Sequence, residues 1–166
     1  MLKKVGLALL LLLVVIQFIQ PTKNQSTEIL ASDITKVRQV PADVQEILTV
    51  ACYDCHSNNS VYPWYSHIQP VAWWLNNHVV EGKQKLNFST FGDYDTKKAN
   101  HKLDETIEVL QKNEMPLKSY TLIHTNAKLT DAQKTLVINW AKSAMVGGET
   151  GNATPVSSEE KEREEH

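Results

Sequence analysis

The chain has 166 residues, of which 42% are hydrophobic and 22% charged, and its formal net charge is −2. This length corresponds to one domain, and the hydrophobic fraction is ordinary for a globular protein. Without the two positive charges of Lys3 and Lys4 the rest of the chain carries −4, so the composition excludes a protein that binds nucleic acid through a basic surface.

The N-terminus has the pattern of an export or anchoring segment. Lys3 and Lys4 precede an apolar run over residues 5–19, and a positive stretch followed by a hydrophobic one is typical of export signals. As a helix the run is about 22 Å long, which is short for a membrane span. However, no A-x-A-like cleavage site and no lipobox cysteine follows. We therefore expect residues 5–19 to be an uncleaved anchor that leaves the domain on the periplasmic side of the bacterial cytoplasmic membrane.

A polar segment over residues 21–40 follows and is expected to be a tether. Pro41 then opens a predicted helix that runs directly into Cys52. The apolar residues of this helix recur at i, i+3, i+4 and i+7, which places them on one face: Val44, Ile47, Leu48 and Ala51.

The stretch Cys52-Tyr53-Asp54-Cys55-His56 is the attachment motif of a c-type haem. At this spacing two thiols can reach the two vinyl groups on one edge of the porphyrin, and the adjacent imidazole can reach the iron. Cys52 and Cys55 are therefore the predicted thioether anchors of one covalent haem c, and His56 is the predicted proximal iron ligand. Covalent attachment takes place outside the bacterial cytoplasmic membrane, which agrees with an exported domain.

The cysteine pair leaves two other interpretations open. A short disulfide or a thioredoxin-like redox pair needs no adjacent histidine and usually lies in a βαβ unit, which this sequence lacks. A zinc site would require a second pair of ligands nearby, and none is arranged that way. Both interpretations fit the sequence less well than haem attachment does.

Two further helices are predicted after the motif. The first spans residues 70–85, with Pro70 near its start and a proposed apolar face of Val71, Trp74, Leu75, His78 and Val79. Residues 86–94 are expected to form an irregular loop. The second helix spans residues 96–112, with Asp95 as its cap and an apolar side that consists of Leu103, Ile107 and Leu110.

A last helix begins after a connecting loop over residues 117–129. Thr130 and Gln133 match a capping box at its start, and Gly147-Gly148 is expected to end it. Its predicted buried face consists of Leu136, Val137, Trp140, Ala141 and Ala144.

These elements divide the chain into four parts. Residues 1–20 are the predicted anchor or signal segment, and residues 21–40 are the tether. The haem-binding domain is expected over residues 41–146. Residues 147–166 have the composition of a disordered charged tail.

The second axial ligand of the iron is predicted to be Met115. A helix that stops before Pro116 leaves Met115 on a loop rather than in a helical core. Thioether ligation raises the reduction potential of a haem, which suits electron transfer. Met145 is expected to fill the core, and His78 and His124 are the alternative ligands.

Several sequence blocks, taken in order, resemble one known family. They are C-Y-D-C-H-S-N at 52–58, Y-P-W-Y-S at 62–66, P-V-A-W-W-L at 70–75, H-V-V-E-G at 78–82, L-N-F-S at 86–89 and M-P-L-K-S-Y at 115–120. Together with the last helix they cover about residues 40–145 and are similar to the small exported haem-binding domains of cytochrome-c-like type. The resemblance implies an all-α, cytochrome-c-like fold around one covalent haem. It implies Cys52, Cys55, His56 and Met115 as the haem-binding residues, and it leaves the role of the aromatic region 62–89 open.

Three functions remain in competition. The first is a membrane-tethered periplasmic electron carrier with His/Met-ligated iron, which is not an enzyme. The second is a haem-based sensor or peroxidase-like enzyme with an open or displaceable sixth position. The third is a domain without haem that a disulfide holds together. The sequence names no redox partner protein, and we expect no nucleic-acid partner.

Overall fold

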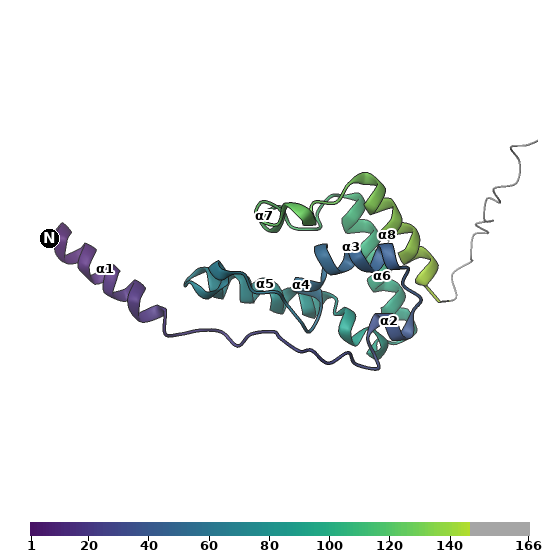
Figure 1. Cartoon of the computed structure of the whole chain (residues 1–166), viewed down its shortest axis with the longest axis horizontal. Coiled ribbons are helices and arrows are strands. Elements are labelled where there is room, and N and C mark those ends of the chain that lie inside the picture. Colours follow the sequence, from purple (N-terminus) through teal and green to yellow (C-terminus); the bar gives the residue numbers. More distant parts are fainter. Residues whose placement is uncertain (147–166) are drawn as a thin grey trace, which may run out of the picture.

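The computed structural model describes residues 1–146. These residues form helices joined by loops, with no β-strand among them. Figure 1 shows one long helix, α1 (Leu2–Ile16), standing apart from the domain that contains the remaining described helices. The predicted all-α fold is therefore confirmed. The predicted helix end at Gly147-Gly148 and the predicted tail lie outside the described residues.

Three helices pack around the main hydrophobic core: α3 (Ala42–Ala51), α6 (Thr96–Gln111) and α8 (Asp131–Ala144). Each has apolar residues at helical spacing, so each presents one apolar face to the others. The residues predicted to face inward from α3 and α6 are all buried: Val44, Ile47, Leu48, Ala51, Leu103, Ile107 and Leu110. Met145, just after α8, packs against this core as predicted.

The buried face of α8 differs from the prediction at one residue. Val137, Trp140, Ala141 and Ala144 are buried as expected, but Leu136 is exposed. Successive residues of a helix are rotated by about 100°, which puts Leu136 at the edge of the face rather than within it.

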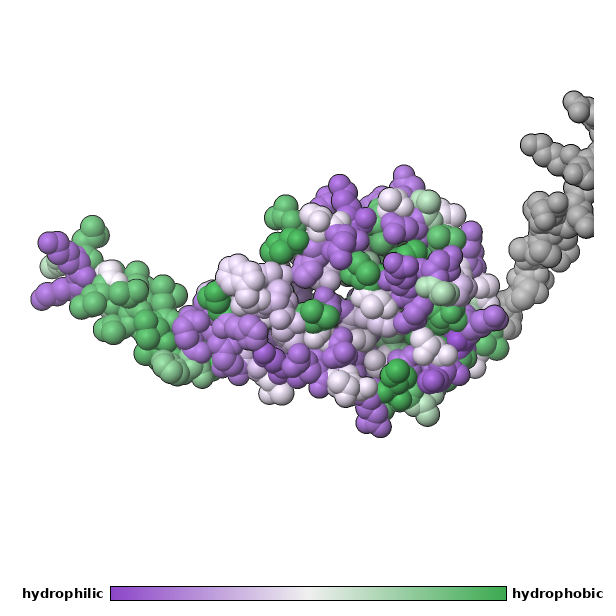
Figure 2. All heavy atoms as spheres, viewed as in Figure 1, coloured by the Kyte–Doolittle hydropathy of each residue, from purple (hydrophilic) through white to green (hydrophobic). Residues whose placement is uncertain are grey.

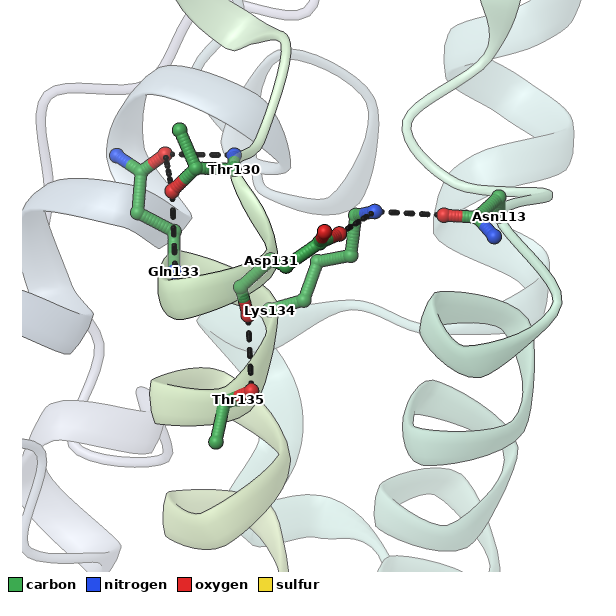
Figure 3. A network of polar contacts seen from close by, with 6 residues as sticks. All are labelled: Asn113, Thr130, Asp131, Gln133, Lys134 and Thr135. Carbon is green, nitrogen blue, oxygen red and sulfur yellow. Dashed lines mark hydrogen bonds and ion pairs between the residues drawn. The ribbon is translucent and has the colours of Figure 1, made fainter.

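The predicted helix caps are present. Asp95 Oδ1 accepts a hydrogen bond from the Lys98 amide (2.8 Å) at the start of α6. At the start of α8, Thr130 Oγ1 accepts from the Gln133 amide (3.2 Å) and Gln133 Oε1 accepts from the Thr130 amide (2.9 Å), as Figure 3 shows. These bonds satisfy amides that have no partner inside the helix. Both helices therefore begin where the sequence indicates.

The remaining elements of the domain, apart from α5, are short, and several lie in regions predicted to be loops: α4 (Tyr53–His56), η1 (Trp64–His67), η2 (Phe88–Asp93), α7 (Lys118–Thr121) and η3 (Thr125–Ala127). The region 86–94 is more ordered than expected. Phe88 and Phe91, both in η2, are among the largest fully buried side chains. The backbone is kinked at Thr90 between them, and both rings enter the core.

Helix α5 (Val71–Lys85) confirms the predicted helix, but its predicted apolar face is wrong in part. Val79 is buried, whereas Val71 and Trp74 are exposed, and the small Ala72 is buried instead. α5 packs against α4 and η1. Val71 and Trp74 instead line a small cavity together with residues of the segment 117–124.

The segment predicted to be a tether runs along the domain, as Figure 1 shows. The Asn24 side-chain amide donates to Ser57 O (2.8 Å) and to Ser60 Oγ (2.9 Å). The Ser26 amide donates to Asn58 O (3.0 Å). Farther along, the short helix α2 (Ile34–Val37) buries Ile34 completely in the main core.

Helix α1 has 15 residues, and none of them is buried. Its large apolar side chains are exposed along its whole length (Figure 2). Within residues 1–146, no helix combines the length and the apolar character needed to cross a membrane.

Candidate functional site

The C-x-x-C-H motif lies where α3 gives way to α4. Cys52 is the first residue after α3 and the cap of α4, and its carbonyl accepts from the amides of Cys55 (3.2 Å) and His56 (2.9 Å). This single turn keeps the two cysteines and the histidine together at one end of α3. The packing of α3 in the main core thus fixes the position of the motif.

Two adjoining cavities, of about 390 and 310 Å³, lie beside the motif. Both are lined by the same central residues: Ala51, Cys52, His56, Lys85, Met115 and Pro116. Cys55 lines the first of them. Volumes of this size are typical of cofactor sites. The structure thus brings the three motif residues and Met115, 59 or more positions later in the chain, to one hollow region.

His56 is oriented by the residue that follows α5. Its Nδ1 donates to the carbonyl of Leu86 (3.0 Å), which leaves Nε2 as the nitrogen available to a metal. Burial lowers the pKa of His56, and the carbonyls of Leu86 and Gly82 oppose that shift without cancelling it. The ring is therefore neutral near pH 7, which is the form of histidine that binds metals.

Gly82 allows α5 to pack closely against the motif. A Cβ at this position would lie 2.6 Å from the carbonyl oxygen and 3.0 Å from the Cβ of Cys55. Such distances are too short for any side chain, and the nearest atom belongs to backbone that cannot swing away. Glycine is therefore required at position 82. It lets α5 pack closely against Cys55, and this brings the backbone of α5 toward His56.

Cys52 and Cys55 are both free thiols in the structure. Burial, and next the nearby Cys55, raises the pKa of Cys52 to about 12, and burial together with Asp54 raises that of Cys55 to about 11. Both groups are therefore protonated at neutral pH, and buried protonated thiols react slowly with disulfides. Two reduced thiols beside a metal-competent imidazole fit the attachment of a haem to this motif.

Met115 is positioned by the way α6 ends. Asn113 has a positive φ of 57°, and the Glu114 amide donates to Val109 O (2.9 Å), which is a helix ending of the Schellman type. Lys134 Nζ of α8 donates to Asn113 Oδ1 (2.6 Å) and to Asp131 Oδ1 (2.9 Å), as Figure 3 shows. This lysine ties the turn before Met115 to the start of α8, so the loop is anchored two residues before Met115.

The two alternative ligands, His78 and His124, lie in different surroundings. His78 of α5 lines the larger cavity, and its Nδ1 donates to Trp74 O (2.8 Å). His124 lines neither of the two adjoining cavities. Its Nε2 lies 2.6 Å from Tyr65 Oη, and its ring stacks on Tyr120 at 4.2 Å. Of the alternatives, only His78 shares a cavity with His56 in the described residues.

Sequence reasoning missed three residues that shape the site: Gly82, Leu86 and Tyr120. Tyr120 Oη donates to Asp54 Oδ2 (2.7 Å), and the other carboxylate oxygen of Asp54 accepts from the Val61 amide (2.9 Å). Burial and this bond both raise the pKa of Tyr120, so the phenol stays protonated and holds the motif to the segment after Met115. All three lie in sequence blocks that resemble the family, but their roles depend on contacts between distant parts of the chain.

Comparison with known proteins identifies the family of the chain. The chain matches the family described as "Haem-binding domain" over residues 11–143, a range that includes the motif, Met115 and the second half of the N-terminal segment 1–20. No curated protein and no solved structure matches the chain. Since the match spans most of the sequence and contains the cavity described above, the chain belongs to the haem-binding domain family.

Proposed function

We propose that this haem-binding protein is a c-type electron carrier tethered on the periplasmic side of a bacterial cytoplasmic membrane. One observation carries the proposal: Cys52, Cys55, His56 and Met115 line the same cavity. When bound, haem supplies a reversible one-electron couple. The protein contributes the attachment points, the iron ligands and a mostly apolar enclosure.

Each residue of the cavity has a separate role in this proposal. Cys52 and Cys55 would hold the haem through thioether bonds. His56 would bind the iron through Nε2, because its Nδ1 is engaged by Leu86. Met115 would supply a second, thioether ligand, and its loop is anchored by Asn113 and Lys134.

Met115 distinguishes an electron carrier from the alternative function. A thioether ligand raises the reduction potential and fills the sixth position, whereas a sensor or peroxidase-like enzyme leaves that position open or displaceable. The constrained loop of Met115 supports the carrier. His78, which lines the same cavity, is the residue that would replace Met115 in a bis-histidine site.

The proposed location depends on the N-terminal segment. Residues 5–19 are apolar and follow Lys3 and Lys4, and the helix formed there is exposed throughout. An exposed apolar helix is stable in lipid rather than in water. Haem c attachment also requires export, so both features support the same side of the membrane.

Spin state and ligand binding test the proposal. The ferric haem protein should be six-coordinate and low-spin by electron paramagnetic resonance, and its reduced form should bind carbon monoxide slowly. A high-spin ferric signal with an exchangeable water, together with rapid carbon monoxide binding, would favour the sensor or enzyme and contradict the carrier.

A further inference from the structure

The aromatic region after the motif contains apolar side chains that the domain does not cover. Trp64 is 76% exposed, and Leu122, in the segment after α7, is 80% exposed. We use the name aromatic rim for the exposed apolar residues of these two segments: Val61, Trp64, Ile68, Val71, Trp74, Leu122 and Ile123. Contiguous exposed apolar residues of this kind usually mark an interaction surface.

The two segments of the aromatic rim form one surface. A small cavity of about 90 Å³ is lined by residues from both of them, including Val61, Trp74 and Ile123. The hydrogen bond between Tyr65 Oη and His124 Nε2 (2.6 Å) joins the segments directly. In Figure 2, hydrophobic residues gather on α1 and on the tip of α7.

Hydrogen bonds to Gln69 and Trp73, which lie next to rim residues in the sequence, fix the end of α1 beside the aromatic rim. The Gln69 amide donates to Gln17 Oε1 (2.9 Å), and Gln17 Nε2 donates back to Gln69 O (3.3 Å). Gln69 Nε2 (2.7 Å) and Trp73 Nε1 (3.1 Å) both donate to the carbonyl of Ile19. The chain therefore leaves its apolar helix at the place where the exposed aromatic residues begin.

The segments near α1 and the aromatic rim contain long stretches without charged residues. Residues 5–22 contain no Asp, Glu, Lys or Arg, and neither do residues 57–80. Neither of these two stretches therefore carries a charge that has to lose its hydration on meeting lipid. The nearest lysines are Lys23, over the ring of Tyr62, and Lys118, four residues before Leu122.

We propose that the aromatic rim lies in the interfacial layer of the lipid bilayer that α1 enters, so that the domain has one fixed orientation on the membrane. This inference rests on the proposed membrane tether. Tryptophan is enriched at the boundary between lipid and water, because its ring is apolar and its N–H is polar. α1 is about 22 Å long, shorter than a hydrocarbon core of about 30 Å, and an apolar surface at its exit end compensates for part of that mismatch.

The proposed orientation also places the haem relative to the membrane. Cys55, His78 and Tyr120 line both the 90 Å³ cavity under the aromatic rim and the larger cavity beside the motif. A rim seated on lipid would therefore hold the haem site close to the membrane surface, facing partners that lie in or on the same bilayer.

Fluorine NMR on the full-length haem protein tests the proposal. The protein is labelled with 5-fluorotryptophan, its resonances are assigned with single Trp→Phe variants, and it is reconstituted into vesicles of phosphatidylcholine and phosphatidylglycerol. Spectra of the reduced protein are compared with and without lipid that carries a doxyl group near its headgroup. The Trp64 and Trp74 resonances should broaden several-fold more than that of Trp140, which is buried in the core.

Two variants sharpen this test. The double variant Gln17→Ala/Gln69→Ala removes the two bonds between the Gln17 side chain and the Gln69 backbone and the bond from Gln69 Nε2 to Ile19 O. It should reduce the broadening of Trp64 while the chain still floats with the vesicles. Gln111→Ala, at an exposed position at the end of α6, is the matched control and should change nothing. Unchanged broadening in the double variant would contradict the orienting role of these bonds.

The outcomes separate the inference from the function on which it rests. Equal broadening of Trp64, Trp74 and Trp140 in a chain that floats with the vesicles overturns the rim and leaves the tether standing. A chain that does not float overturns the tether and the rim together. Haem content measured on the same samples reports separately on the haem site.

Discussion

The two sides of the domain are built differently. On one side α3, α6 and α8 fill their shared interior with their own side chains, and Leu48, Leu103 and Val137 are almost completely inaccessible. On the other side α4, α5, the segment 113–124 and one side of α6 border cavities that the protein leaves hollow, and Val137 lies at the boundary between the two sides. We call them the core side and the cavity side. The fold therefore holds the C-x-x-C-H motif at the edge of a core that protein side chains fill by themselves.

The core side should show the largest loss of stability on truncation. Leu103→Ala removes a side chain that is 1% exposed, and leaves a cavity that its packed neighbours cannot close. We expect a loss of about 2–5 kcal/mol in the free energy of unfolding. Urea denaturation of the haem-free protein measures it. A loss below about 1 kcal/mol in the free energy of unfolding would show that the core side is not close-packed. The core side and the cavity side would then not differ in packing.

The buried thiols of the cavity side predict an alkaline loss of stability in the haem-free protein. In the unfolded chain the thiols ionise near pH 9.0, whereas in the folded chain their pKa values are about 12 and 11. Between these values the folded state binds more protons, so stability is complete below pH 9 and falls as the pH rises. The slope is at most about 1.4 kcal/mol per pH unit for each thiol.

The Cys52→Ala/Cys55→Ala double variant is the control for that slope. Lysines and tyrosines also titrate in this range, so the informative quantity is the difference between the two proteins. Stability curves from pH 8 to 11 should be flatter in the double variant. Parallel curves would indicate that the thiols are exposed rather than enclosed by the cavity side.

Gly82→Ala tests the close packing of α5 on the motif. The added Cβ would meet the Cys55 carbonyl at 2.6 Å, so α5 must shift away. Overpacking of this kind costs about 1–3 kcal/mol, and the shift should also lower the yield of attached haem. Gly6→Ala, where nothing lies within 4 Å, is the matched control. Full haem yield in Gly82→Ala would mean that the site tolerates a wider gap.

Met115→Ala should have the smallest effect on the stability of the haem-free protein, less than about 1 kcal/mol, because the side chain borders a hollow rather than a packed core. In the haem protein the same change should leave haem attached, open the sixth position and lower the reduction potential. Redox titration and visible spectra measure both effects. Unchanged spectra, followed by a change in His78→Ala, would assign the second ligand to His78.

Sequence alone predicted the core side well. α3, α6 and α8 combine helical periodicity with local caps such as Asp95 and Thr130, and local signals of this kind need no knowledge of distant contacts. The C-x-x-C-H motif was recognisable for the same reason, since its chemistry depends on spacing within five residues.

The cavity side was predicted less well, because its contacts join distant parts of the chain. Tyr120 and Asp54 are 66 positions apart, and the bonds of Gln69 to Gln17 and Ile19 cross about 50. The hydrophobic periodicity of a helix also does not show which part of the protein, if any, covers its apolar face. The apolar residues of α5 that were expected to face the protein are partly exposed, beside a cavity and the aromatic rim.

A pyridine haemochrome spectrum of the denatured protein tests the central claim most directly. The full chain is produced in a host that matures c-type cytochromes, purified and unfolded. Covalent attachment at Cys52 and Cys55 predicts a c-type spectrum that stays with the polypeptide and is lost in the double cysteine variant. Haem that separates from the unfolded chain, or a c-type spectrum that persists without both cysteines, would contradict the account.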